Sequence, residues 1–397
     1  MLSVEEAKKI LIDAVPLPET GKMKVQDSLG YVLAADLLSP IDVPLFDQSA
    51  VDGYAICFDR NRLKGNVFPL TREVKAGDAP ILKMKINSAV RIFTGAPVPS
   101  NANCVVMQEK VNVAEQQVEV IEEFLKEGSN IRRKGNQIRK GGAGLKKGIT
   151  LSPAAIGFLN TIGCSIVKVF KKPRIGILVT GNELVKAGNK LKPGQIYESN
   201  SGTLESVLLQ SGYKAGQKSH VKDEKKLVLS AVKKLLANND VLIISGGISV
   251  GKYDFVKEVL AALKVKELFY KVAQKPGKPL FVGMKGRKIV FAVPGNPAAA
   301  LVCYYQYILP TLDKLSGKEN LGLEKVMMKS NTDYTGKGDR SLFLKSLIEN
   351  GGVSILDGQD SDNLLSFSGA NSLVYLPIEN LEIRRGDAVE VFKFPSR

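Results

Sequence analysis

Four glycine-containing loops carry the residues whose types and spacing suit chemistry on a phosphate or another oxyanion. They are residues 180–183 (TGNE), 245–251 (SGGISVG), 275–279 (KPGKP) and 294–297 (PGNP). Glycine lets the backbone approach a ligand closely and turn its N–H groups inward, and a helix start adds partial positive charge. Full positive charge comes from Lys271, Lys275 and Lys278. Any one loop is also explained as a turn between a strand and a helix, but the four together favour an anion site.

Carboxylates are the second chemical theme. Asp47 and Asp52 lie in the segment FDQSAVDGYA, and Glu183, Asp223 and Asp254 lie at or near predicted loop ends. Phosphoryl chemistry usually needs a divalent cation held by one or two carboxylates and by the substrate phosphate. The alternative for any single aspartate, such as Asp52 before its glycine, is that it caps a turn.

The residues and motifs that the chain lacks exclude several reaction classes. Because His220 is the only histidine, multi-histidine zinc sites are impossible and a hydrolytic triad would depend on that residue, which we interpret as a surface histidine at a strand end. No GxxxxGK[ST] motif occurs and no GxGxxG follows the first strand of the α/β region, which argues against a Walker-type nucleotidase and against nicotinamide or flavin. The cysteines have no CxxC spacing, and we interpret them as reduced, buried thiols: Cys57, Cys104, Cys164 and Cys303.

Size and charge indicate a multidomain protein with anionic partners. The 397 residues are too many for one core, and 56 basic against 40 acidic residues give a net charge of +16. Nucleic acid is one candidate, but the basic runs are not interleaved with aromatic residues and no nucleic-acid-binding signature is visible. No apolar stretch reaches the roughly 18 residues of a membrane span. The N-terminus predicts a helix capped by Ser3 rather than a secretory signal, so we expect a cytoplasmic protein.

Alternating strands and helices predict the scaffold that positions the four loops. Apolar strands are predicted at residues 174–181, 241–244 and 289–293, and helices near 201–210, 223–237, 255–263 and 297–315. This order predicts a parallel α/β sheet whose ligand site lies at the carboxyl ends of its strands.

Shorter strands separated by turns characterise the rest of the chain. Residues 56–142 predict a small β domain, and residues from 319 to the end predict a small β-barrel or sandwich. An alternating strand is predicted at residues 22–29, and a helix behind a Ser152 cap at residues 152–163.

A series of motifs in this chain resembles the MoeA family, which is shared with the E domain of gephyrin. They are FDQSAVDGYA (46–55), TGAPVP (94–99) followed by VVMQE, IRRKG (131–135), TGNEL (180–184), YESN (197–200), SGGISVG (245–251) with Asp254, KPGKP (275–279) and PGNP (294–297). No single motif is decisive, but their ordered sum is highly specific.

The resemblance implies an elongated multidomain chain of α/β plus β class that forms a homodimer. Its implied parts are an N-terminal helical and linker domain (1–25, 41–55 and 143–172), a small β-rich insert (26–40 and 56–142), a molybdopterin-binding three-layer α/β/α domain (173–318) and a C-terminal β-barrel domain (319–397). The active site would lie between the α/β domain of one subunit and the first half of the other.

The implied reaction joins molybdate to adenylylated molybdopterin, with Mg²⁺, and releases AMP and the molybdenum cofactor. The implied catalytic residues are Asp52, Glu183, Asp223, Asp254, Lys271 and Lys275, and the implied metal ligands among them are Asp52, Glu183 and Asp254. The implied substrate-binding residues are Thr94, Arg132, Ser245, Gly246, Gly247, Ser249, Lys278, Pro294, Pro297, Arg340 and Ser366. Such a site would act by electrostatic positioning, without a covalent nucleophile.

Two departures from the family pattern concern the metal site. The family usually continues its arginine motif with glycine, an acid and aspartate, whereas Gly135 is followed here by Asn136 and Gln137. Asn182 stands where the family often has aspartate. An amide oxygen can ligate a cation but brings no negative charge, so these changes could weaken metal binding, retune it, or leave it to the remaining carboxylates.

Three other functions compete with the transferase. A related adenylyltransferase would share the α/β fold but not the long N-terminal half. A catalytically impaired scaffold or cofactor-binding paralogue would keep the fold and agrees with the amides at positions 136 and 137. A nucleic-acid binder would rest on charge alone.

Overall fold

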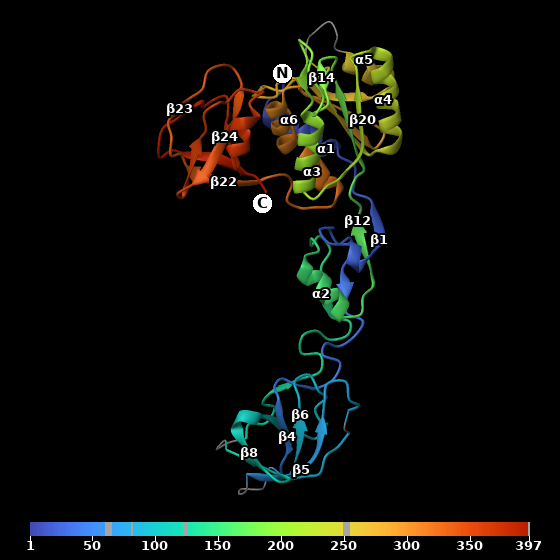
Figure 1. Ribbon diagram of the computed structural model, residues 1–397, viewed down its shortest axis with the longest axis vertical. Coiled ribbons are helices and arrows are strands. Elements are labelled where there is room, and N and C mark those ends of the chain that lie inside the picture. Colours follow the sequence, from blue (N-terminus) through green and yellow to red (C-terminus); the bar gives the residue numbers. More distant parts are fainter. Residues whose placement is uncertain (60–65, 81, 122–124, 249–254, 396–397) are drawn as a thin grey trace. The chain divides into compact units, whose positions relative to one another are not determined.

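The chain folds into two compact units. The computed structural model describes residues 1–59, 66–80, 82–121, 125–248 and 255–395 (Figure 1). One unit comprises Met1–Gly21, Gly30–Val32 and Val169–Arg397, and the other comprises Lys22–Leu29 and Leu33–Lys168. Within the described ranges, every helix is too short or too polar to span a bilayer.

A six-stranded sheet forms the centre of the larger unit. Its order is β16-β13-β17-β21-β20-β18, and its strands are β13 (Ile175–Thr180), β16 (Ala215–Val221), β17 (Val241–Ser245), β18 (Lys266–Tyr270), β20 (Phe281–Lys285) and β21 (Lys288–Val293). The first four strands in this order run parallel, but β20 and β18 are antiparallel to their neighbours. The prediction of a parallel sheet was therefore wrong at one edge, because a tight hairpin joins β20 to β21.

Helices cover both faces of this sheet, as expected for three layers. They are α3 (Asn200–Gln210), α4 (Lys225–Asn238), α5 (Phe255–Ala262), α6 (Pro297–Cys303) and α7 (Leu309–Leu315), with a π-helical turn at Tyr304–Ile308. Figure 1 shows α4 and α5 on one side and α3 and α6 on the other. Strands β13 and β17 are buried along their whole length, since helices pack on both faces. These helices confirm the predicted pattern.

The first helix, α1 (Val4–Ala14), packs on this unit. Ser3 Oγ accepts from the Glu6 N–H at 3.1 Å and Glu6 Oε2 accepts from the Ser3 N–H at 2.8 Å, which forms a capping box. Val4, Ala7 and Leu11 lie in the same core as the strands of the sheet. The sequence predicted that residues 1–25 belong to an N-terminal helical and linker domain, whereas α1 packs on the larger unit. The difference arises because the apolar face of α1 needs a large apolar surface to cover it.

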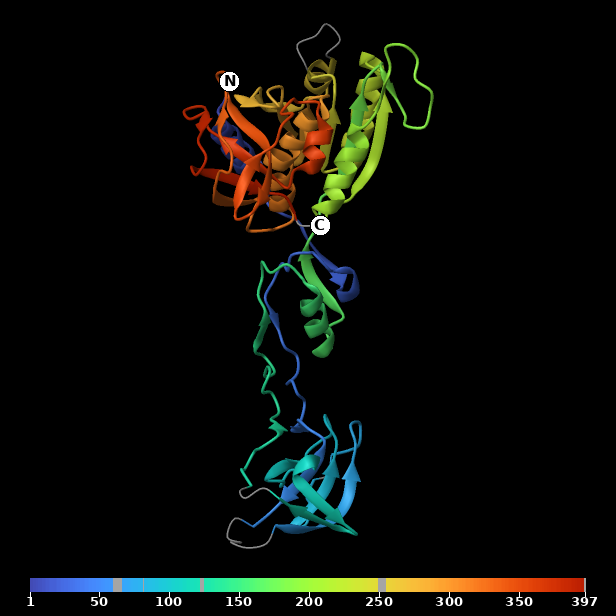
Figure 2. The same ribbon diagram turned by 60° about the vertical axis from the view of Figure 1, so that its left-hand side comes forward.

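The C-terminal strands form a second sheet in the larger unit (red in Figure 2). Its order is β19-β24-β26-β28-β22, with β25 paired to β24, and its strands are β19 (Gln274–Lys275), β22 (Glu324–Lys329), β24 (Ser341–Glu349), β25 (Gly352–Ile355), β26 (Ser372–Leu376) and β28 (Ala388–Lys393). Strands β23 (Tyr334–Thr335) and β27 (Glu382–Ile383) pair separately, and α8 spans Leu364–Gly369. Strand β19 belongs to the KPGKP region, so this sheet includes part of a predicted ligand loop.

The smaller unit contains another six-stranded sheet, with the order β7-β4-β6-β5-β9-β8. Its strands are β4 (Gly53–Cys57), β5 (Val67–Val74), β6 (Ser88–Ile92), β7 (Cys104–Met107), β8 (Val111–Ala114) and β9 (Gln117–Val120). Two short pairs accompany it, β2 (Leu37–Leu38) with β11 (Ala143–Leu145) and β3 (Gln48–Ser49) with β10 (Ile131–Arg132). Together with the larger unit, this sheet confirms the predicted α/β plus β fold class.

The local predictions for the two ends of this unit had mixed outcomes. Helix α2 (Pro153–Thr161) has the predicted cap, because Ser152 Oγ accepts from the Ala155 N–H at 3.2 Å. The strand predicted at residues 22–29 is shorter: β1 (Thr20–Lys24) pairs with β12 (Ile166–Phe170), and a 3₁₀ turn follows at Val25–Asp27. The strand ends there because the Ser28 hydroxyl donates to the Val25 carbonyl at 2.7 Å and closes the turn.

Candidate active site at the carboxyl edge of the sheet

A cleft of about 570 Å³ lies where the parallel strands of the larger unit end. Loops after β13, β16, β17 and β21 form its walls, as the rule for open α/β sheets predicts. Its lining includes these predicted site residues: Glu183, Asp223, Ser245, Gly246, Gly247, Pro294 and Pro297. Three of the four predicted loops thus meet in one cleft, and the fourth contributes Pro279.

Glycines form the wall after β17. Gly246 has φ +93°, and a Cβ atom added to it would lie 2.5 Å from the Thr180 carbonyl oxygen. Gly247 has φ +62°. Only glycine satisfies both the left-handed backbone and the close approach at position 246. The cleft is therefore bounded here by bare backbone that a ligand can contact directly.

A buried amide at the start of α3 connects two of the loops. Asn200 Nδ2 donates to Ser245 Oγ at 2.8 Å and to the Gly295 carbonyl at 2.6 Å. Asn200 Oδ1 is also buried, and within the described part of the chain no donor reaches it. An unpaired buried acceptor that lines a cleft suits a ligand that brings an N–H or O–H group.

Four carboxylates line the cleft, whereas no lysine or arginine is among its described lining residues. They are Glu183, Glu198, Asp223 and Asp362. Burial raises the pKa of Asp223; an interaction with Thr180 opposes this rise, and the charge of Glu183 adds to it. The cleft is therefore acidic and would repel a free phosphate.

Asn182, where the family often has aspartate, contacts one of these carboxylate residues. Its Oδ1 accepts from the backbone N–H of Asp223 at 3.2 Å. An amide oxygen performs this backbone contact as a carboxylate would. The exchange therefore removes a negative charge from beside the acidic cleft and keeps the link between the two loops.

The carboxylates do not form a ready-made metal centre. Among the residues that the structure describes, no three acidic, histidine or cysteine side chains converge as metal ligands. Mg²⁺ binds commonly to one or two carboxylates together with substrate phosphates. Glu183, Asp223 and Asp362 make no ion pair that the described residues record, so a single one of them is available to a cation that is shared with a substrate.

The KPGKP loop is fixed from below by a buried network. Gln274 is fully buried; its Nε2 donates to the Pro276 carbonyl at 3.1 Å, and its Oε1 accepts from the Tyr307 hydroxyl at 2.5 Å. A Cβ atom at Gly277, which has φ +95°, would lie 2.6 Å from Gln274 Nε2. The network holds the backbone, so the exposed lysines on both sides of Gly277 project from a rigid turn.

The three predicted lysines do not line the cleft itself. Lys275 and Lys278 are exposed. Lys271 has φ +66°, and its Nζ lies 4.9 Å from the centre of the Tyr270 ring. Only Pro279 from this loop reaches the lining. The lysines therefore add charge beside the cleft rather than inside it.

A loop of the C-terminal sheet, residues 357–363, carries Asp362 to the cleft. Lys345 is 3% exposed, and its Nζ donates to the carbonyls of Gly358 (2.5 Å), Asp360 (3.1 Å) and Asn363 (3.3 Å). The same loop is joined to the PGNP loop, because Asn296 Nδ2 donates to Ser361 Oγ at 2.6 Å. Burial lowers the pKa of Lys345, and the charges of Asp360 and Asp362 oppose this.

Arg340 and Ser366 lie away from the cleft. Arg340 Nε lies 3.6 Å from Asp339 Oδ1. The Ser366 hydroxyl donates to the Asp357 carbonyl at 2.5 Å, so this serine stabilises the loop that carries Asp362. Ser249 and Asp254 fall outside the described residues.

Sequence reasoning assigned no role to Glu198, Asn200, Asp362 or Lys345. The YESN motif was visible and could have singled out the first two. Nothing near Asp362 or Lys345 in the sequence marks them, because both act through long-range contacts.

Asp52, Thr94 and Arg132 belong to the smaller unit. Asp52 Oδ1 accepts from the Thr94 N–H at 2.8 Å and from its hydroxyl at 2.7 Å. These two hydrogen bonds lower the pKa of Asp52. Arg132 is exposed on β10, opposite Gln48. The structure brings Asp52 and Thr94 together across 42 positions of the sequence, which is a different contact from the local turn cap that we had considered as the alternative.

The remaining sequence predictions concern the histidine and the cysteines. His220 is exposed on β16, which confirms the surface interpretation. None of the four cysteines, all within the described residues, forms a disulfide; Cys57, Cys104 and Cys303 are buried, whereas Cys164 is half-buried. Burial raises the pKa of the Cys303 thiol to about 12, so this thiol is unreactive.

Comparison with known proteins identifies the class. A family model for the MoeA N-terminal region (domain I and II) matches residues 2–163, and a model for a probable molybdopterin binding domain matches residues 176–314. A crystal structure of the molybdopterin biosynthesis MoeA protein from Pyrococcus horikoshii superposes with a TM-score of 0.83 at 30% identity and covers 100% of both chains. The fold is thus that of a MoeA-type protein.

Sequence relatives define the family more narrowly. Molybdopterin molybdenumtransferase from a Nostoc species is 32% identical over 418 residues, which cover 100% of this chain and 94% of that protein. The enzyme of the same name from Haemophilus influenzae is 32% identical over 406 residues, which cover 99% of each chain. This chain belongs to the molybdopterin molybdenumtransferase family, and the resemblance found in its motifs is confirmed.

Proposed function

We propose that the cleft binds adenylylated molybdopterin and that the chain transfers molybdenum from molybdate to it, with release of AMP. Membership of the family makes the chain a transferase of molybdenum cofactor biosynthesis. The observation that supports the location most directly is the cleft itself, in which bare glycine backbone and four carboxylates meet at the carboxyl edge of the sheet.

The acidity of the cleft supports a requirement for Mg²⁺. A substrate with a pyrophosphate bridge cannot approach four carboxylates unless a cation compensates the repulsion. Glu183 is our proposed ligand in the cleft, and Asp52 and Asp254 remain proposed ligands from outside the described lining. The ion would supply electrostatic stabilisation of the charge that develops when the phosphoanhydride breaks.

The protein groups would bind and orient the two reactants. Backbone N–H groups of Gly246 and Gly247 are suited to a phosphate or molybdate oxygen. Lys275 and Lys278 would contact anionic groups that extend past Pro279, because the rigid turn fixes where their side chains begin. The unpaired Oδ1 of Asn200 would accept a hydrogen bond from the pterin, whose ring carries several N–H donors.

We further propose a cytoplasmic homodimer in which a second copy completes the site. The predicted functional set is divided between two compact units, with Glu183 and Asp223 in one and Asp52, Thr94 and Arg132 in the other. A partner copy that supplies the second group would explain this division. Mass measurement in solution tests the dimer, and mixing inactive Glu183→Gln with inactive Asp52→Asn protein would restore part of the activity only if sites are shared.

AMP release from purified protein, adenylylated molybdopterin and molybdate tests the function. Wild-type protein should release AMP only when both molybdate and Mg²⁺ are present. Lys275→Ala should abolish release, whereas Lys226→Ala, which removes an exposed charge from α4, should not change it. Absence of molybdate-dependent AMP release by the wild type would instead favour the scaffold paralogue.

A further inference from the structure

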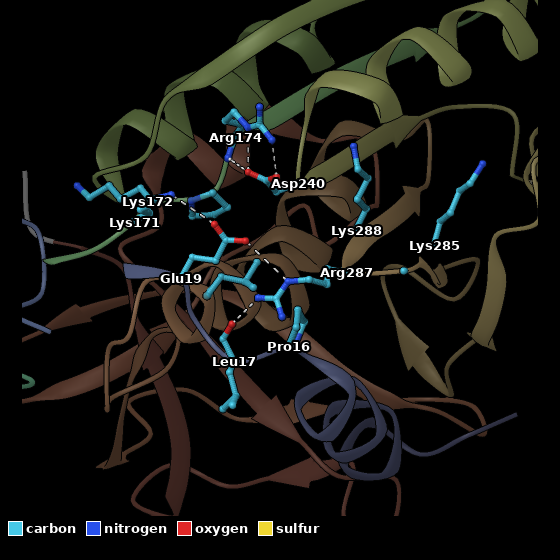
Figure 3. A pocket seen from close by; sticks show the side chains of 13 residues that line it. Pro16, Leu17, Glu19, Lys171, Lys172, Arg174, Asp240, Lys285, Arg287 and Lys288 are labelled. Atoms are coloured by element: carbon cyan, nitrogen blue, oxygen red, sulfur yellow. Dashed lines mark hydrogen bonds and ion pairs between the residues drawn. The ribbon is translucent and has the colours of Figure 1, made fainter. Parts of the chain in front are cut away.

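A second pocket, of about 750 Å³, lies at the opposite edge of the same sheet, where β13 and β17 begin (Figure 3). It is lined by Pro16, Leu17, Glu19, Lys171, Lys172, Pro173, Arg174, Asp240, Lys285, Gly286, Arg287, Lys288 and Leu315. No predicted site residue is in this set. The pocket is therefore separate from the carboxyl-edge cleft and needs its own explanation.

Positive charge dominates the pocket. Six lysines and arginines face two acids, and both acids already have partners. Asp240 accepts from Arg174 Nε at 3.2 Å and from Nη2 at 2.9 Å. Glu19 lies between Lys171 Nζ at 3.5 Å and Arg287 Nε at 3.8 Å, as Figure 3 shows. The lining residues thus carry an excess of four positive charges.

The hairpin between β20 and β21 contributes a like-charge pair. Lys285 and Lys288 lie directly opposite each other across the two strands, an arrangement that opposes pairing. Lys288 Nζ donates to the Leu236 and Ala237 carbonyls at the end of α4, where the helix dipole favours a cation. For Lys285 the described residues record no hydrogen bond or ion pair, and Figure 3 shows its side chain extended. The fold itself makes no use of this charge.

An apolar surface lies among these cations. Pro16, Leu17, Pro173 and Leu315 supply it, and Leu17 is 80% exposed. The segment that carries Leu17 is fixed, because the Leu17 carbonyl accepts from Arg287 Nη2 at 2.7 Å. An exposed leucine held in place within a cationic rim suits a partner that brings both carboxylates and an apolar side chain.

We propose that this pocket docks an acidic segment of a partner protein, with an apolar side chain of that segment resting on Leu17. A small free anion fits less well, because Lys171, Arg174 and Arg287 keep 58%, 66% and 59% of their side chains exposed and solvated cations hold single anions weakly. A segment with several carboxylates contacts many of these cations at once. The described lining has no aromatic side chain on which a nucleic-acid base would stack.

The test uses short fluorescein-labelled peptides and the full-length protein. One peptide alternates glutamates with leucines, a second replaces its leucines with serines, and a third replaces its glutamates with glutamines. Fluorescence anisotropy should show binding of the first peptide at physiological salt and weaker binding of both others. The double variant Lys171→Glu/Lys285→Glu should weaken binding of the first peptide by about tenfold or more. The remaining binding should depend less on the salt concentration. The matched charge change Lys226→Glu/Lys233→Glu, on the exposed face of α4, should leave binding unchanged.

Three results would overturn the proposal. Equal weakening by both double variants would show attraction to the net charge alone, and no binding at physiological salt would remove the docking site. Preferential, Lys285-dependent binding of an oligonucleotide or of phosphatidylserine vesicles would assign the pocket to another class of partner. Because none of these residues lines the carboxyl-edge cleft, these outcomes are independent of the proposed transferase activity.

Discussion

The two edges of the central sheet handle negative charge in opposite ways. At the carboxyl edge, four carboxylates and bare glycine backbone line the cleft, and the lysines lie beside it. At the amino edge, six cations line the pocket and both acids are paired. The first arrangement repels a free phosphate, whereas the second attracts anionic groups directly.

This difference teaches how one sheet separates chemistry from recognition. The backbone of the acidic edge is fixed by contacts such as those of Gly246 and Asn200, which suits the precise positioning of a bound substrate. The basic edge has exposed, solvated charges that suit association rather than catalysis. Substitutions at the two edges should therefore have very different consequences.

After the loss of AMP release expected of Lys275→Ala, the largest effect is expected from Gly246→Ala. The new Cβ atom would lie 2.5 Å from the Thr180 oxygen in a left-handed conformation, so the loop must move. Displacement of the site by about an ångström should reduce AMP release roughly a hundredfold. Single-turnover measurements of AMP release would check this, and circular dichroism would verify that the variant is folded. Gly157→Ala is the control, because nothing lies within 4 Å of the added atom there. Near-normal turnover would remove the glycine wall from the mechanism.

Lys345→Met should have the next largest effect. The change leaves the carbonyls of Gly358, Asp360 and Asn363 without their common buried donor, and it should lower the free energy of unfolding by about 2 kcal/mol. The freed loop carries Asp362, so turnover should also fall by about tenfold. Lys345→Arg should restore part of the stability and part of the turnover. Urea titration would measure the free energy of unfolding, and AMP release would measure the turnover. Unchanged turnover despite lost stability would limit the loop to a structural role.

The pH dependence of the acidic edge gives a moderate effect. The pKa of Asp223 is raised, chiefly by burial, so its carboxylate should be lost at a higher pH than an ordinary aspartate loses its charge. Turnover should fall as the pH drops through this raised pKa, and Asp223→Asn should abolish that limb of the profile. The free energy of unfolding should change in the opposite direction, because burial makes the charged carboxylate of Asp223 costly in the folded state. Above the raised pKa, Asp223→Asn should therefore be more stable than the wild type. Below the ordinary pKa of 3.8 this difference should disappear. Identical acid limbs in both proteins would contradict the assignment.

The amino edge should give the smallest effects on activity. Asp240→Asn breaks a pair whose side chains are 66% and 40% exposed, which should change the free energy of unfolding by about 0.5 kcal/mol. Lys285→Glu should leave AMP release within error of the wild type. Any marked loss of turnover from either substitution would break the proposed separation between the two edges.

The sequence by itself determined the local features and the site's general location. The helices that follow Ser3 and Ser152 could be predicted because capping depends on neighbours a few residues away. The glycine loops after β13, β17 and β21 could be placed at one edge because parallel strands end together. The motifs resembling the MoeA family added the reaction, which no local pattern could supply.

Tertiary structure alone decided the charge of each edge and the groups that hold the loops in place. Asp362 reaches the cleft only because Lys345 and Asn296 hold its loop, and the basic pocket joins Leu17, Arg174 and Lys285 from distant parts of the chain. The reversal of β20, which puts the Lys285 hairpin at the amino edge, also escaped the sequence pattern. The charge at each edge depends on which strands and loops lie side by side. The packing of the whole sheet fixes that order, and no single segment of the sequence determines it.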